Sequence, residues 1–167
     1  MERMRIVCVL AASVAFAAAC DSSTDVTPRI LYRATLNGAS EVPATTSTAT
    51  GDFSAQLLPN KTLSYSLTWT TGLTGTANAA HIHGPADATQ TANILVNFAS
   101  PPAATTNDTV NFTTRIAWGN LDLNQAVTAE VSGDSLIKLL DAGLLYVNIH
   151  TVANSGGEIR GQITRQQ

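Results

Sequence analysis

The chain has 167 residues, and its 9 basic and 12 acidic side chains give a formal net charge of −3. This length fits one domain with one hydrophobic core and leaves little room for a second. Because the balance is slightly acidic and the basic residues do not cluster, we expect no nucleic-acid partner.

The amino-terminal segment is typical of a secretory signal. Arg3 and Arg5 precede an apolar run over residues 6–16, and small residues lead up to Cys20. The run is too short to serve as a stable membrane anchor. We therefore predict that residues 1–19 are a signal peptide that is removed on export.

Residues 17–20 read Ala-Ala-Ala-Cys and resemble the lipobox of bacterial lipoproteins. The resemblance implies that Cys20 carries lipid and anchors the protein to a bacterial membrane, either in the periplasm or at the cell surface. The other interpretation is an ordinary signal peptide with a chance cysteine. Residues 20–29 are rich in Ser, Thr and Asp and are predicted to form a flexible tether. The remaining cysteine, Cys8, lies in the signal peptide, so the mature domain has no thiol for a disulfide.

A single β-rich domain is predicted for residues 30–167. Apolar and polar residues alternate in short runs that are separated by Gly, Pro and Asn, and helical periodicity is scarce. The clearest feature is a hairpin of residues 52–58 and 62–69, which has one apolar face. Further strands are expected at residues 31–36, 80–83, 94–98, 110–116, 126–131, 145–151 and 158–164.

One short helix is expected at residues 134–142, capped by Ser132 or Asp134 and closed by Gly143. Its apolar face would cover an edge of the sheet. This series of short strands with one helix suits an all-β fold, an antiparallel β-sandwich of the immunoglobulin-like or superoxide-dismutase-like kind.

Five segments, in this order along the chain, resemble a known domain family. They are LNGASEVP at residues 36–43, TG at 50–51, AHIHGPA at 80–86, YVNIHT at 146–151 and GEIRGQI at 157–163. Together these motifs look like a CHRD domain, a family named for its occurrence in chordin. The resemblance implies an extracellular, β-rich domain that is common in exported bacterial proteins. It implies no defined chemistry.

The chain has three histidines, His81, His83 and His150, and all of them lie in the recognised motifs. Residues i and i+2 of a strand face the same side about 6.5–7 Å apart, so His81 and His83 can reach one metal through bonds of about 2.0–2.1 Å. The same alternation puts Val147 and Ile149 in the core and His150 on the opposite face. If the two strands are neighbours, three imidazoles meet at a site suited to copper or zinc.

Two functions remain open on the sequence alone. In the first, His81, His83 and His150 hold a copper or zinc ion, and the protein is a metal-binding module. In the second, they bond to backbone and side chains without any cofactor, and the domain contacts a protein or glycan partner at the cell surface. Glu158 and Arg160, two apart on one strand, are expected to be structural, paired with each other or bracing nearby backbone.

We expect no enzymatic activity. The sequence has no Gly-x-Ser-x-Gly elbow, no phosphate-binding glycine loop and no visible pair of carboxylates. The pair His81 and His83 weakly resembles the copper site of copper-zinc superoxide dismutases. Those enzymes use more imidazoles than this chain has, together with a disulfide, so dismutase activity is not expected.

Overall fold

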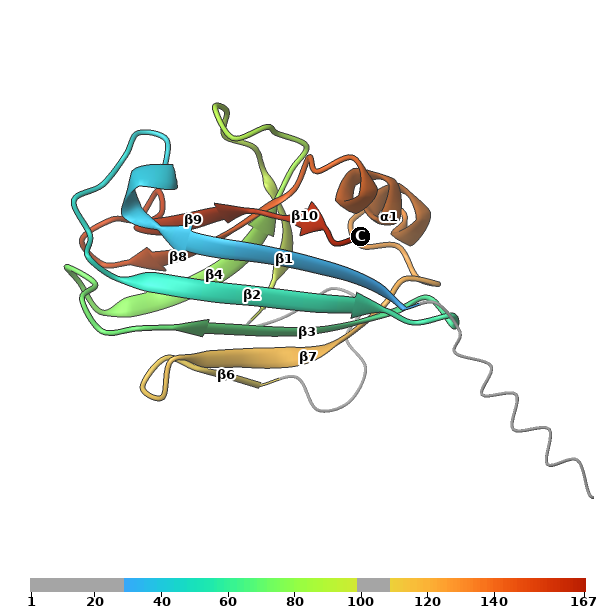
Figure 1. The fold of residues 1–167 in the computed structure, drawn as a ribbon, viewed down its shortest axis with the longest axis horizontal. Coiled ribbons are helices and arrows are strands. Elements are labelled where there is room, and N and C mark those ends of the chain that lie inside the picture. The colour runs from blue at the N-terminus through green and yellow to red at the C-terminus, as the bar shows by residue number, and fades with distance from the viewer. Residues whose placement is uncertain (1–28, 99–108) are drawn as a thin grey trace, which may run out of the picture.

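The computed structural model describes residues 29–98 and 109–167 (Figure 1). The predicted signal peptide (residues 1–19), Cys20 and all of the predicted tether except Arg29 lie outside the described residues. In the described part of the chain, no helix is both long and apolar enough to cross a membrane.

The described residues form an all-β fold with ten antiparallel strands and one short α-helix, which confirms the predicted class. The strands pair in the order β5-β4-β8-β9-β1-β2-β3-β7-β6, and β10 pairs with β1. Their bounds are β1 (Ile30–Asn37), β2 (Thr50–Leu57), β3 (Thr62–Trp69), β4 (Ala77–His83), β5 (Ile94–Asn97), β6 (Thr109–Asn111), β7 (Ile116–Asp122), β8 (Tyr146–Thr151), β9 (Ile159–Gln162) and β10 (Thr164–Arg165).

The sheet curls so that its two halves face each other across one core, in the manner of a sandwich (Figure 1). Strand β3 illustrates how one face of the sheet contributes to this core. Its apolar residues Leu63, Tyr65, Leu67 and Trp69 are buried and alternate with more polar ones. Phe98, next to β5 in the other half, packs against Tyr65 with ring centroids 4.9 Å apart. Inward-facing side chains of both halves therefore share one core.

Helix α1 (Gly133–Asp141) lies at the end of the sandwich where the described chain begins (Figure 1). The Ser132 side chain caps it by accepting a hydrogen bond from the backbone three residues on, and Gly143 follows with a φ of +66°. Its apolar side buries Leu136 and Leu140 completely. The predicted helix and its cap are confirmed.

The expected single strand over residues 110–116 is wrong. The chain turns between β6 and β7, and the Asn111 Oδ1 accepts hydrogen bonds from the backbone N–H groups of Thr113 and Thr114 at 3.0 and 2.9 Å. An asparagine that bonds to the backbone two and three residues on stabilises a turn in place of a strand. Strand β7, which follows this turn, was not predicted beyond Ile116.

The expected strand over residues 126–131 is also wrong. This stretch pairs only through one isolated bridge, between Ala126 and Ser132. Thr128 Oγ1 accepts hydrogen bonds from the backbone N–H groups of Glu130 and Val131 at 3.2 and 3.0 Å. This local bonding folds the segment back on itself before α1 begins.

Candidate metal centre

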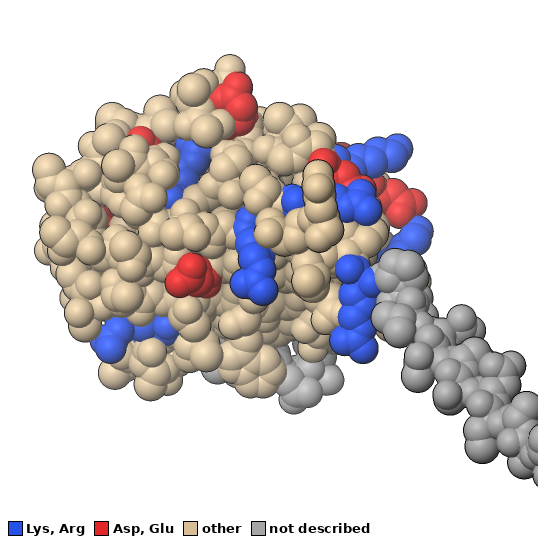
Figure 2. Space-filling view, in the orientation of Figure 1, with Lys and Arg blue, Asp and Glu red and all other residues tan. Residues whose placement is uncertain are grey.

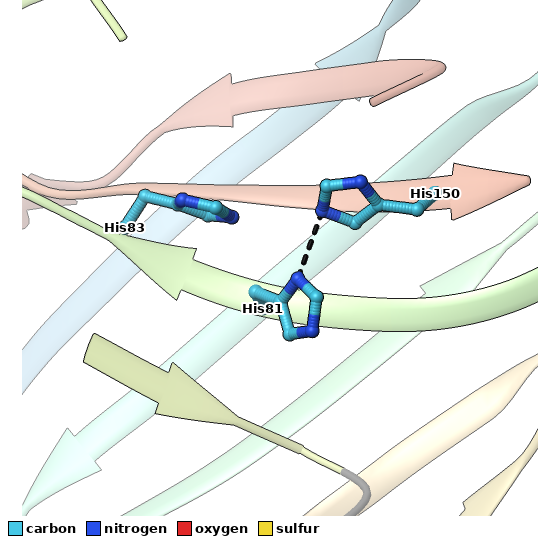
Figure 3. Close-up of side chains that lie close together, drawn as sticks. All are labelled: His81, His83 and His150. Carbon is cyan, nitrogen blue, oxygen red and sulfur yellow. Dashed lines mark hydrogen bonds between the residues drawn. The ribbon is translucent and has the colours of Figure 1, made fainter. Parts of the chain in front are cut away.

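The three histidines lie on neighbouring strands. His81 and His83 are on β4, His150 is on β8, and His81 pairs across the ladder with Asn148, two residues before His150. Ile82, between the two β4 histidines, faces the core, so the imidazoles lie on the opposite face of the sheet. One ligand nitrogen from each imidazole lies within 4.8 Å of the other two (Figure 3). The three histidines therefore converge, which the sequence had left conditional on the two strands being neighbours.

Hydrogen bonds define which ring nitrogens face the cluster. His83 Nδ1 lies 2.9 Å from the carbonyl oxygen of Ala92, and His150 Nδ1 lies 2.9 Å from that of Ser155. A carbonyl oxygen can only accept, so in each ring Nδ1 carries the proton and Nε2 keeps its lone pair. His150 Nε2 in turn accepts a hydrogen bond from Nδ1 of His81 at 2.9 Å, drawn as a dashed line in Figure 3.

The imidazoles are buried even though they lie outside the hydrophobic core, with exposed fractions of 7%, 7% and 8% for His81, His83 and His150. Burial disfavours the charged form and lowers the pKa of all three, that of His81 to about 4. The neighbouring imidazoles lower the pKa of His81 further. The three rings are therefore neutral at pH 7, the form that binds metals.

One of these nitrogens has no partner. His83 Nε2 is buried and accepts no hydrogen bond in the described structure. Leaving a buried polar atom unpaired costs about 1–3 kcal/mol, and such atoms are rare in native proteins. The lone pair of His83 Nε2 is therefore free to bind an ion within the cluster.

A stack of side chains supports His83. The Tyr146 ring lies nearly parallel to the His83 ring, at 5°, with centroids 5.0 Å apart, and the Arg160 guanidinium lies 3.5 Å from the Tyr146 centroid. Strand β8 runs between β4 and β9, so His83 and Arg160 flank Tyr146. Arg160 also donates to the backbone carbonyls of Gln90 and Asp87, each at 2.8 Å. It thereby holds the β4–β5 loop, residues 84–93, beside the cluster.

Glu158 and Arg160 were expected to pair with each other or to brace nearby backbone, and they bond to other groups: Arg160 braces the backbone carbonyls of Gln90 and Asp87. Glu158 is completely buried, and burial alone would raise the pKa of its carboxyl group. Hydrogen bonds to the carboxylate outweigh burial and lower this pKa to about 2. The donors, which come from three other segments, are the Thr151 Oγ1, the Thr74 backbone N–H, the Ser47 Oγ and the Asn154 Nδ2.

Glu41 also lies in this region, turned inward beside Pro43 as the sequence suggested, but the sequence did not connect it to the histidines. After β1 the chain forms a short 3-10 helix, η1 (Gly38–Ser40), in which the Asn37 Oδ1 accepts the backbone N–H of Ser40 at 2.9 Å. The turn directs Glu41 inward, where it is 7% exposed and lines a cavity of about 610 Å³ with Gly157. Burial raises the pKa of Glu41, although nearby polar and charged groups oppose this. In the sequence, the pair Asn37-Gly38 indicates this turn.

Comparison with protein families gives a match that covers most of the chain. Residues 32–163 match the model of the CHRD domain family, and this range contains all three histidines together with Glu41, Glu158 and Arg160. A search of curated proteins finds no match to the chain.

Proposed function

The chain belongs to the CHRD domain family, and we propose that it is an extracytoplasmic metal-binding domain that holds one copper or zinc ion on His81, His83 and His150. The observation that carries the proposal is the convergence of three buried, neutral imidazoles from two strands. Family membership alone supplies neither a ligand nor a reaction. The proposed role is binding, without catalysis.

The hydrogen bonds around the rings favour a metal over a purely structural role. Metal-bound histidines usually donate the other ring N–H to a carbonyl or carboxylate, which fixes the ring orientation. His83 and His150 already do so, to Ala92 and Ser155. A purely structural histidine in a buried position would have both ring nitrogens bonded, whereas His83 Nε2 is not.

The donor atoms determine the class of metal. Imidazole nitrogens suit copper and zinc, whereas calcium and magnesium prefer oxygen ligands. Two nitrogens on a tetrahedral zinc lie roughly 3.3 Å apart when each bond is about 2.0–2.1 Å, and His81 Nδ1 and His150 Nε2 are 2.9 Å apart. All three ligand nitrogens lie within 4.8 Å of one another, so the widest pair would close by up to roughly 1.5 Å around the ion. His81 would bind it through Nδ1 by shifting its proton from Nδ1 to Nε2.

We also propose that Cys20 carries a lipid, which would hold the domain at a bacterial membrane, in the periplasm or at the cell surface. The lipobox-like sequence before Cys20 supports this. Arg29, the first described residue, and Arg165 line one cavity, and Figure 2 shows further basic side chains at that end of the domain. Basic groups there would favour an anionic membrane surface. Replacing Cys20 by serine should move the protein from the detergent phase to the aqueous phase of a phase-partition assay.

The metal proposal is tested by calorimetric titration of residues 26–167 with Zn(II), Cu(II) and Cu(I). Every core residue in the described part of the chain lies between Tyr32 and Ile163, so this fragment keeps all of them. We expect binding of one ion per chain and a rise in the unfolding temperature that follows occupancy.

The double variant His81→Ala/His83→Ala should lose this binding. Ser155→Ala is the matched control, because it alters a residue beside the site yet keeps the backbone carbonyl that orients His150. If no metal binds more tightly than about 100 μM, the proposal is wrong, and the domain is better explained as a protein- or glycan-binding module.

A further inference from the structure

Asn148 lies beside the histidine cluster, and its amide oxygen has no hydrogen-bond partner. It is the ladder partner of His81 and lies on the same face of β8 as His150. Its side chain is 1% exposed. The Nδ2 atom donates to Glu41 Oε1 at 3.5 Å, whereas Oδ1 is buried and has no hydrogen-bond partner.

Glu41 determines how the Asn148 amide is turned. The amide donates through Nδ2 to Glu41 Oε1, so its NH₂ group faces Glu41 and its oxygen lies on the other side. Gly157 packs against both groups, because a Cβ atom at this position would clash with Glu41 Oε1 and Asn148 Nδ2. The amide is therefore held in one orientation in a filled space.

Two unpaired acceptors are thus buried in one region, Asn148 Oδ1 and His83 Nε2. Asn148 lies two residues after Tyr146, the ladder partner of His83, on the same face of β8, which places its side chain beside that ring. Each unpaired acceptor is costly by itself. A cation between them would satisfy both lone pairs at once, whereas a second protein acceptor could satisfy neither.

We infer that Asn148 Oδ1 is a fourth ligand of the metal, beside His81, His83 and His150, and that Glu41 is a positioning residue that orients it. The inference rests on the proposed function and names a further side chain that binds the same metal ion. Three nitrogens and one carbonyl-type oxygen suit a divalent ion, Zn(II) or Cu(II). Cu(I) prefers softer donors, so the oxygen would favour the divalent state.

The test compares Asn148→Leu, which removes the oxygen, with Asn148→Asp, which keeps one, in residues 26–167. We expect Asn148→Leu to weaken Cu(II) binding about tenfold or more and to change the parallel hyperfine coupling in the Cu(II) electron paramagnetic resonance spectrum. Asn148→Asp should restore the affinity. Cu(I) affinity, measured with a competing chelator, should change by less than about threefold, since this ion gains little from the oxygen.

A measurement on the unaltered domain does not depend on the folding of any variant. Deuterium modulation in the pulsed spectrum of Cu(II) in D₂O reports a directly bound water molecule. We expect no such signal from an equatorial ligand when Asn148 fills the fourth position. In the Glu41→Gln variant, residue 41 no longer selects one orientation of the Asn148 amide, so part of the bound-water signal should appear.

The outcomes separate the two proposals. If the histidine variants abolish Cu(II) binding while Asn148→Leu keeps the affinity and the spectrum, Asn148 is no ligand and the proposed function stands. A strong signal from bound D₂O in the unaltered domain would likewise overturn the role of Asn148 alone. If the unaltered domain binds no metal, both proposals are wrong.

Discussion

His81 and His150 are 69 residues apart in the sequence, yet His81 Nδ1 and His150 Nε2 lie 2.9 Å apart in a buried position. This hydrogen bond joins β4 to β8 on the face of the sheet that points away from the core. Without a metal, the contact holds two neutral rings together through one proton. The same two atoms would bind the metal in the proposed site.

Without metal, the domain is expected to lose stability as the pH falls from about 6.5 to about 4. Burial lowers the pKa of His81 to about 4 from its ordinary value of 6.5. Between these values the unfolded chain binds a proton that the folded chain does not bind, so the free energy of unfolding falls as the pH falls. Urea denaturation in the presence of a chelator measures this. His81→Gln should flatten the dependence, and an unchanged slope would contradict the explanation.

Replacing Glu158 by glutamine is expected to destabilise the domain by about 1.5–3 kcal/mol at pH 7, the usual value of a hydrogen bond to a charged group. The pKa of Glu158 is lowered to about 2 from 4.5. Its contribution is therefore fully present above about pH 4.5 and is lost as the pH falls toward 2. Thermal unfolding at pH 7 and pH 3 should show a smaller difference at pH 3. The exposed Glu130→Gln is the matched control.

The neighbouring glycines Gly156 and Gly157 are expected to respond differently to alanine. Gly157 has a φ of +128°, and a Cβ there would clash with Glu41 and Asn148, so Gly157→Ala should cost about 1–3 kcal/mol and weaken metal binding. A Cβ at Gly156 meets no atom within 4 Å. Gly156→Ala should stay within about 0.5 kcal/mol of the unaltered domain. Equal effects in denaturant titrations would rule out this packing argument.

Arg160→Lys is expected to loosen the β4–β5 loop although it keeps the positive charge. Lysine cannot reproduce the two parallel bonds to the carbonyls of Asp87 and Gln90, nor the flat contact with Tyr146. Hydrogen exchange should become faster in residues 84–93, and metal should dissociate faster. Arg165→Lys, at a half-exposed ion pair with Asp141, is the control and should change neither rate.

The alternation within single strands was predictable, because it depends on local sequence. On β8, Val147 and Ile149 face the core and His150 faces away from it, as expected. The sequence did not determine whether β4 and β8 are neighbours, because no local signal pairs strands that lie so far apart along the chain. The contact between Asn148 and Glu41 could not be predicted, because it joins segments that meet only in the folded chain.

The two wrong strands have a different cause. Asn111 and Thr128 occur in stretches whose apolar and polar residues alternate as in a strand. Their side chains bond to the backbone two and three residues on, and this local bonding outweighs the pattern. The helix, in contrast, was predictable because its cap residue, its apolar side and the glycine after it all agree.

The positions of the three histidines along the chain also determine when the site can form during synthesis. Synthesis from the amino terminus delivers His81 and His83 long before His150, so β8 can pair with β4 only after the segments between them have been made. The carbonyl of Ser155 that orients His150 arrives later still. A site that requires all three imidazoles therefore stays incomplete on an unfinished chain, and metal capture becomes a late event that reports a finished domain.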